Sequence, residues 1–312
     1  RNHGNYTNLP ADSPQEEPGR AESEVTKVAA NVSMSKKKKK SRTLSYMGLS
    51  IFVFIMLIPF LFVIMLSFKN NTDILMNPLA WPDSLDFSNY ANAIKTLNPF
   101  RLIGNTLFIA VLTMAIEMVI TFLSAVALTR LVFRHDKVQD FLYSFMLLGL
   151  AIPIYVLLFP IYRMTVLFHL KGSYFSLVLP YIATSVSFNT LIFTGFLREF
   201  PSEIEEAAII DGCSLWQTIY KIILPVVKPV LVTVFIFNVL YIWNEFPLAV
   251  TLISDEAKAT ISLGISMFKG RYTIDYGGII AASLMIMTPQ VIFYGFFQKY
   301  IIEGMTAGAV KG

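Results

Sequence analysis

Long apolar segments, separated by shorter polar ones, dominate the chain from about residue 44 onward. About 20 consecutive apolar residues cross a bilayer as an α-helix, so each segment of that length is a candidate transmembrane span. The first segment is too long for the core of a signal peptide and no small-residue cleavage site follows it, so we expect an uncleaved anchor. The pattern predicts six transmembrane helices, over residues 44–67, 104–129, 141–165, 174–197, 229–253 and 277–297. Several prolines fall in or near these spans, and we interpret them as kinks that serve helix packing.

One polar stretch, residues 198–228, interrupts this pattern between the fourth and fifth predicted spans. Ser202 and Glu205 have the spacing of a capping box, in which the hydroxyl accepts from a backbone N–H and the carboxylate reaches back. Acidic side chains are also favoured in the first turns of a helix by its dipole, and Glu203, Glu205 and Glu206 lie there. These features predict a helix that begins at Ser202.

A turn and a second helix follow in the same stretch. Gly212 predicts the end of the first helix, because glycine adopts the left-handed conformation at low cost. Ser214 and Gln217 form a second capping box, apolar residues recur at helical spacing after it, and Pro225 predicts the end of the run. We therefore expect two short helices around a glycine turn, outside the bilayer. We call this pair of helices the hairpin. Its local features fit two alternatives equally well: a hairpin that lies passively on the membrane surface, and a docking site for another protein.

The positive charges predict an orientation, because cytoplasmic loops of membrane proteins carry an excess of lysine and arginine. With the N-terminus in the cytoplasm, 17 of the 25 basic residues fall on the cytoplasmic side and 8 on the outer side. We therefore expect both termini and residues 198–228 to be cytoplasmic, and residues 68–101 and 254–276 to form outer loops. The run Lys36 to Lys40 fits topology and contact with anionic lipid, so we expect no nucleic acid partner.

The two ends of the chain differ in composition from the middle. Residues 1–43 are polar, which predicts a disordered cytoplasmic tail that buries no core. Residues 1–33 have the character of a tag, a linker or an upstream extension, and Met34 looks like a more natural start. Residues 298–312 form a second predicted cytoplasmic tail.

The composition agrees with a membrane protein and limits the chemistry. The chain is 55% hydrophobic and 15% charged, whereas soluble domains have about 25% charged residues. Its single cysteine, Cys213, excludes an intrachain disulfide and a cysteine metal cluster, and its three histidines are scattered. The sequence has no GxxxxGK[ST] phosphate loop and no nucleophile–base constellation. We therefore expect no catalytic residue, no metal site and no cofactor bound by this chain.

Polar residues inside the spans are candidates for contact with a ligand, because they are costly in lipid and face the protein interior. Amide and carboxylate groups beside an aromatic ring suit hydrogen bonds to a ligand that carries hydroxyl groups. The alternative is that Asn189 and Asn244 bond neighbouring helices and that Glu245 lies near the outer end of its span. The candidates for a substrate pathway are Glu117, Asn189, Tyr241, Trp243, Asn244 and Glu245.

The polar stretch also resembles a known signature. Glu206-Ala207-Ala208, Gly212 and the later Ile222 and Leu224-Pro225 match without a gap the cytoplasmic EAA signature of inner-membrane permeases of binding-protein-dependent ABC importers. The resemblance covers most of the chain from about residue 44. Further similar segments are 105–106, 125–130, 243–246 and 304–312, and the last two resemble the carbohydrate branch, maltose type. Cys213 departs mildly from the family, which more often has a small residue such as alanine there.

The resemblance implies an all-α integral membrane fold with six transmembrane helices, that of a type I ABC importer permease. It also implies partners: a second permease in a heterodimer, two cytoplasmic ATPase subunits that bind ATP and Mg²⁺, an extracytoplasmic solute-binding protein, and a sugar or oligosaccharide. The location implied is the inner or plasma membrane of a bacterial-type cell.

In this family the helical stretch sits in a cleft of the ATPase, and the C-terminal tail also reaches the ATPase dimer. The matching positions for ATPase coupling are Glu205, Glu206, Ala207, Ala208, Asp211, Gly212, Ile222, Leu224 and Pro225, and those for the tail contact are Thr306, Gly308 and Lys311.

Two other classes of protein remain alternatives. A self-contained, ion-driven secondary transporter would need intramembrane carboxylates at a midplane site and an inverted repeat. Glu117 alone is thin support for that class, and no clear repeat is visible. A membrane-embedded enzyme would need paired carboxylates, a histidine cluster or a nucleophile with its base, and none of these supports it.

Overall fold

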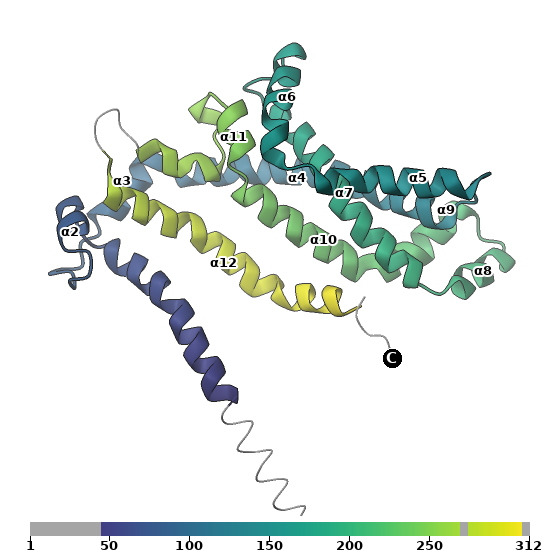
Figure 1. The fold of residues 1–312 in the computed structure, drawn as a ribbon, viewed down its shortest axis with the longest axis horizontal. Helices are drawn as coiled ribbons and strands as arrows, with labels where there is room; N and C mark the ends of the chain where they lie inside the picture. Colours follow the sequence, from purple (N-terminus) through teal and green to yellow (C-terminus); the bar gives the residue numbers. More distant parts are fainter. Residues whose placement is uncertain (1–44, 269–273, 308–312) are drawn as a thin grey trace, which may run out of the picture. The chain divides into compact units, whose positions relative to one another are not determined.

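A computed structural model of the chain describes residues 45–268 and 274–307, and the elements in these ranges are all helical (Figure 1). The expected N-terminal tail, residues 1–43, lies outside the described residues, and so do Gly308 and Lys311 of the expected C-terminal contact. Thr306 lies in the last helix, α12 (Tyr276–Ala307).

The chain divides into two units, residues 1–62 and 63–312. In the first unit, the helix that begins at Ser45 is long and apolar enough to cross a membrane. Apart from this helix, the elements described below belong to the second unit.

Five helices of the described residues are long and apolar enough to cross a membrane. They agree with five of the six predicted spans, with shifts at their ends. They are Ser45–Leu66, α4 (Pro99–Arg130), α7 (Phe175–Glu199), the continuous helix Leu215–Asn244 and the segment Tyr276–Tyr300 of α12.

The predicted span 141–165 is not one straight helix. Helices α5 (Asp136–Leu147) and η1 (Leu148–Ala151) are followed by α6 (Ile154–Leu167), with a bend of 100° between the two parts. The cause is Pro153, which keeps the preceding Ile152 out of helical conformation, at φ −95° and ψ 112°. Counting this bent pair as one span gives six.

The predicted fifth span, residues 229–253, is shifted toward the N-terminus. Its helix ends at Asn244, and α11 (Pro247–Leu252) is a separate short helix. Pro247 has no N–H with which to continue the backbone hydrogen bonds of the helix. The Glu245 carboxylate accepts hydrogen bonds from the backbone N–H groups of Leu248 (2.6 Å) and Ala249 (3.1 Å), so it caps the new helix.

The two predicted outer loops contain short helices, α2 (Asn71–Met76) and α3 (Ser88–Leu97) in the first, η3 (Glu256–Lys258) and η4 (Ile261–Phe268) in the second. The Asn89 amide donates to the carbonyl oxygens of Ser67 (2.9 Å) and Lys69 (2.8 Å). The Gly277 N–H donates to Asn71 Oδ1 (3.0 Å), so these segments are fixed to the start of α12.

Helices α4, α7 and α10 (Leu224–Asn244) lie side by side, and α12 packs against α10 (Figure 1). Two apolar clusters form between these helices. The larger one includes Leu102, Leu177 and Leu248 and extends to η4 and α12. The smaller one, around Phe122, Phe193 and Ile223, lies at the ends of α4 and α7 and supports the polar stretch 198–228.

Candidate functional site

The polar stretch folds as predicted into a helix, a glycine turn and a second helix. Helix α8 (Ser202–Ile210) ends in a turn in which Gly212 has φ +83°. The backbone N–H of Cys213 donates to the carbonyl of Ala208 (2.9 Å), which closes the C-terminus of α8. The turn leads into α9 (Leu215–Thr218), whose predicted capping box is confirmed: Ser214 Oγ accepts from Gln217 N and Gln217 Oε1 accepts from Ser214 N.

The predicted capping box at Ser202 is wrong. The residue that precedes α8 is Pro201, and it makes no side-chain cap. Glu205 does not reach back to the start of the helix, because its Oε1 accepts a 2.7 Å hydrogen bond from Arg130 Nε. A charge-assisted bond to a guanidinium is stronger than a bond to a neutral N–H.

Pro225 does not end the second helix, which corrects a second prediction. The chain stays helical from Leu215 to Asn244, through a π-helical segment at Ile219–Ile223. Proline lacks an N–H and clashes with the carbonyl four residues earlier, and a wider π turn relieves both problems. The second helix is therefore the start of the fifth span.

Helix α8 has an inward and an outward face. Its buried residues are Glu205 and Ala208, whereas Glu206 and Ala207 are exposed. Asp211, Gly212 and Pro225 are also exposed, and Ile222 and Leu224 are half-buried. Large apolar side chains are exposed around the turn, and so much apolar surface beside polar residues is typical of a protein docking site. These side chains are Ile204, Ile209, Ile210, Leu215, Trp216 and Tyr220.

Arg130, which is not among the predicted site residues, joins three elements at this site. It is the last residue of α4, its Nε bonds Glu205 of α8, and its Nη2 donates to the Leu197 carbonyl near the end of α7 (2.6 Å). Both partners of the ion pair are largely withdrawn from solvent, with 15% of the Arg130 side chain and 11% of the Glu205 side chain exposed. The sequence feature that could have predicted this pair is a basic residue at the end of one span and an acidic helix expected on the same side of the membrane.

Two of the six candidates for a substrate pathway belong to a cluster of buried polar side chains between α4, α7 and α10. Glu117 Oε2 accepts a hydrogen bond from the Ser185 hydroxyl, and Asn189 Oδ1 accepts from Asn238 Nδ2 at 2.9 Å. Within the described residues, Glu117 Oε1 and Asn189 Nδ2 are buried without a hydrogen-bond partner. The structure therefore places polar side chains inside this helix bundle, as expected of intramembrane polar residues.

Three other candidates lie at the end of α10. Glu245 is buried and, besides capping α11, accepts a 2.6 Å hydrogen bond from the Tyr181 hydroxyl. Trp243 is buried and donates from Nε1 to the Ile286 carbonyl of α12 (3.3 Å). Asn244 is exposed, and its amide donates within its own helix to the Leu240 carbonyl (2.7 Å).

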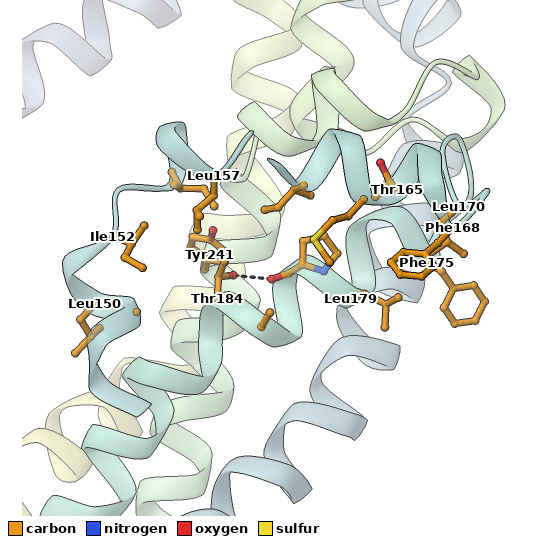
Figure 2. A pocket seen from close by; sticks show the side chains of 16 residues that line it. Leu150, Ile152, Leu157, Thr165, Phe168, Leu170, Phe175, Leu179, Thr184 and Tyr241 are labelled. Carbon is orange, nitrogen blue, oxygen red and sulfur yellow. Dashed lines mark hydrogen bonds between the residues drawn. The ribbon is translucent and has the colours of Figure 1, made fainter. Parts of the chain in front are cut away.

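The sixth candidate, Tyr241, lines a cavity of about 680 Å³ between α6, α7 and the bend at Pro153. Figure 2 shows Tyr241 and Thr184 near one another on its wall, with Phe168 and Phe175 at the far end. Apart from the hydroxyls of Tyr241, Thr184 and Thr165, the lining side chains are apolar. Thr184 already donates to the Pro180 carbonyl (3.0 Å). The cavity as formed by this chain alone therefore offers few groups for hydrogen bonding to a polar ligand.

Comparison with known proteins gives related permeases. The chain is 38% identical over 256 residues to an ABC transporter permease, ORF2, of Caldicellulosiruptor sp., covering 82% of this chain and 92% of the relative. It is 31% identical to the diacetylchitobiose uptake system permease NgcG of Streptomyces coelicolor, covering 82% and 84%. It is 30% identical to the multiple sugar-binding transport system permease MsmG of Streptococcus mutans, covering 82% and 92%.

The fold is also similar to that of a solved structure. A chain from the crystal structure of a bacterial ABC transporter that imports the acidic polysaccharide alginate superposes with a TM-score of 0.68 at 21% identity, covering 82% of this chain and 95% of that one. Residues 118–306, which include α8 and α9, match the model of the family described as "binding-protein-dependent transport system inner membrane component". The chain therefore belongs to the inner membrane component family of binding-protein-dependent transport systems.

Proposed function

We propose that this chain is a permease subunit of an ATP-driven importer of sugars or oligosaccharides, and that α8 and α9 are its point of contact with a cytoplasmic ATPase. The observation that carries the proposal is the exposed apolar surface around the Gly212 turn, with Ile210 85% and Trp216 67% exposed. Such a surface on a capped hairpin fits a protein partner better than a passive loop.

Energy reaches this chain through contact, since its sequence has no phosphate loop. Two ATPase subunits that close on ATP would each grip one such hairpin, one on this chain and one on a second permease. Because α9 continues through the π segment into α10, movement of the hairpin displaces the fifth span as a near-rigid body.

The substrate class is inferred from the relatives, among them the diacetylchitobiose permease NgcG and the multiple sugar permease MsmG. A binding protein would deliver the sugar on the side opposite α8. In that orientation α8, α9 and both termini are cytoplasmic, and the tail with Thr306, Gly308 and Lys311 reaches the ATPase. The protein would reside in the inner or plasma membrane of a bacterial-type cell.

A second permease would complete the pathway. The apolar cavity beside Tyr241, and the exposed Tyr155 and Phe159 of α6, fit a surface covered by another membrane subunit. Tyr241 is the candidate best placed to meet the substrate at that boundary. Glu117, Asn189, Trp243, Asn244 and Glu245 stay predictions for the pathway.

The test is purification of the chain from cells that express it together with the other subunits of its system. We expect an ATPase and a second permease to co-purify. In proteoliposomes, ATP hydrolysis should rise when a binding protein loaded with its sugar is added. Uptake that proceeds without an ATPase and follows an ion gradient would overturn the proposal in favour of a secondary transporter.

A further inference from the structure

Few residues of helix α8 are buried against the rest of the protein. The helix packs against α9, and its buried residues are Glu205 and Ala208. Alanine provides a small contact, so the Glu205–Arg130 ion pair is the main polar attachment of α8 to the helix bundle. The adjacent Glu206 is exposed.

The surroundings of Arg130 favour a positive charge from three directions. The residue lies at the C-terminus of α4, where the helix dipole is negative, and its Nη2 bonds a carbonyl in the last turn of α7. Its Nε bonds Glu205 in the first turns of α8, where a carboxylate is favoured in turn. Planar guanidinium donors reach both oxygens at once, which a lysine ammonium on its flexible stem does less well.

We propose that Arg130 is a positioning residue that locks α8 to the ends of α4 and α7. It keeps Glu205 inward, so that Glu206, Ala207 and Ile210 face outward toward the partner. It also gives the hairpin a second mechanical connection to the spans, beside the covalent one through α9 and α10. This inference rests on the proposed coupling role of α8, since a lock matters for transport only if force enters there.

The first measurement tests the lock without any partner. Cys213 is the sole cysteine, so the variant Cys213→Ala, Ile210→Cys carries one nitroxide label on the exposed end of α8. We expect low mobility of the label in the purified permease and clearly higher mobility when Arg130→Ala or Glu205→Ala is added. Arg198→Ala is the matched control, because Arg198 stacks on the Tyr143 ring (4.3 Å) and, in the part of the chain that the structure describes, makes no hydrogen bond or ion pair with α8. It should leave the label unchanged.

The second measurement tests the consequence in the assembled transporter. Each single variant should lower the maximal rate of sugar uptake by about tenfold per ATPase complex, with the KM for sugar unchanged, because α8 is remote from the pathway. The double variant Arg130→Ala, Glu205→Ala should lose no more than the worse single variant, because each residue acts through the other. Arg130→Lys should recover part of the rate, and it serves as the readout if Arg130→Ala does not fold.

The outcomes separate the two proposals. Unchanged label mobility in the Arg130 and Glu205 variants, or additive losses in the double variant, would overturn the lock. If the label responds as expected but the wild-type chain neither binds an ATPase nor depends on one, the lock stands and the coupling role of α8 fails. A raised KM at an unchanged maximal rate would also overturn the positioning role.

Discussion

The hydroxyl of Tyr181 donates a 2.6 Å hydrogen bond to Glu245 Oε2 and thereby joins α7 to the break between α10 and α11. Both residues are buried, and the same carboxylate accepts from two backbone N–H groups of α11. Both carboxylate oxygens of Glu245 thus accept hydrogen bonds from groups of this chain. The geometry favours a structural role for it at the position where the fifth span stops.

The first prediction follows from this pair. Tyr181→Phe removes one donor from a buried carboxylate, which should reduce the free energy of unfolding by about 1–3 kcal/mol. Glu245→Ala should destabilise more, because it also uncaps α11. The measurement is the melting temperature of the detergent-purified permease. Asn244→Ala is the control, since that exposed side chain bonds only within its own helix among the described residues. A raised KM for sugar in Tyr181→Phe, with no loss of stability, would instead assign Glu245 to the substrate.

The second prediction concerns the turn after α8. Gly212 has φ +83°, and the space around a Cβ placed there is open, so a valine would be strained by its backbone conformation alone. Gly212→Val should lower uptake by about tenfold or more while the protein still inserts, because the hairpin geometry changes. Uptake equal to wild type would contradict a role of this turn in coupling.

Gly172 provides a matched control for that experiment. It has φ +75° and equally open surroundings, but it lies between α6 and α7, in a turn that donates to the Leu252 carbonyl. Gly172→Val therefore imposes a similar backbone strain away from α8. We expect uptake to fall much less in this variant, measured at equal amounts of protein in the membrane.

Local chemistry in the sequence predicted much of the hairpin, and contacts distant in sequence explain the rest. The Ser214 capping box and the Gly212 turn depend on residues within a few positions of each other. The Arg130–Glu205 pair joins residues far apart in the chain, so the sequence could not show that Glu205 would leave its predicted cap.

The prolines also show how far structure can be predicted from a single sequence. Pro153 produces a bend of 100°, whereas Pro225 follows a π-helical segment and the helix continues beyond it. The outcome depends on which neighbours satisfy the freed backbone groups, and a single sequence does not contain that information. The apolar spans themselves were predictable, because each needs only length and composition.

The third prediction addresses the exposed apolar surface. Ile210→Asp should weaken co-purification of the ATPase by about tenfold or more if this side chain is part of a docking site. The melting temperature of the permease alone should not change, because the residue is 85% exposed. Leu79→Asp is the control, since Leu79 is 83% exposed but lies between α2 and α3. Equal retention of the ATPase by both variants would show that the apolar turn is not the contact.

The fourth prediction distinguishes an ATP-driven permease from an ion-driven carrier at Glu117. In Glu117→Gln the amide oxygen still accepts a hydrogen bond from Ser185, but the side chain can no longer carry a proton or neutralise the charge of a cation. Uptake driven by ATP should stay within about threefold of wild type, because a neutral amide costs less to bury than a carboxylate for which the described residues show no cationic partner. The measurement compares uptake into proteoliposomes with ATP and with an imposed proton or sodium gradient.

An ion-driven carrier would lose gradient-dependent uptake in this variant while binding of the sugar persists. A rise in KM with ATP-driven rate retained would instead place Glu117 in contact with the sugar, since a carboxylate accepts more strongly than an amide from a hydroxyl.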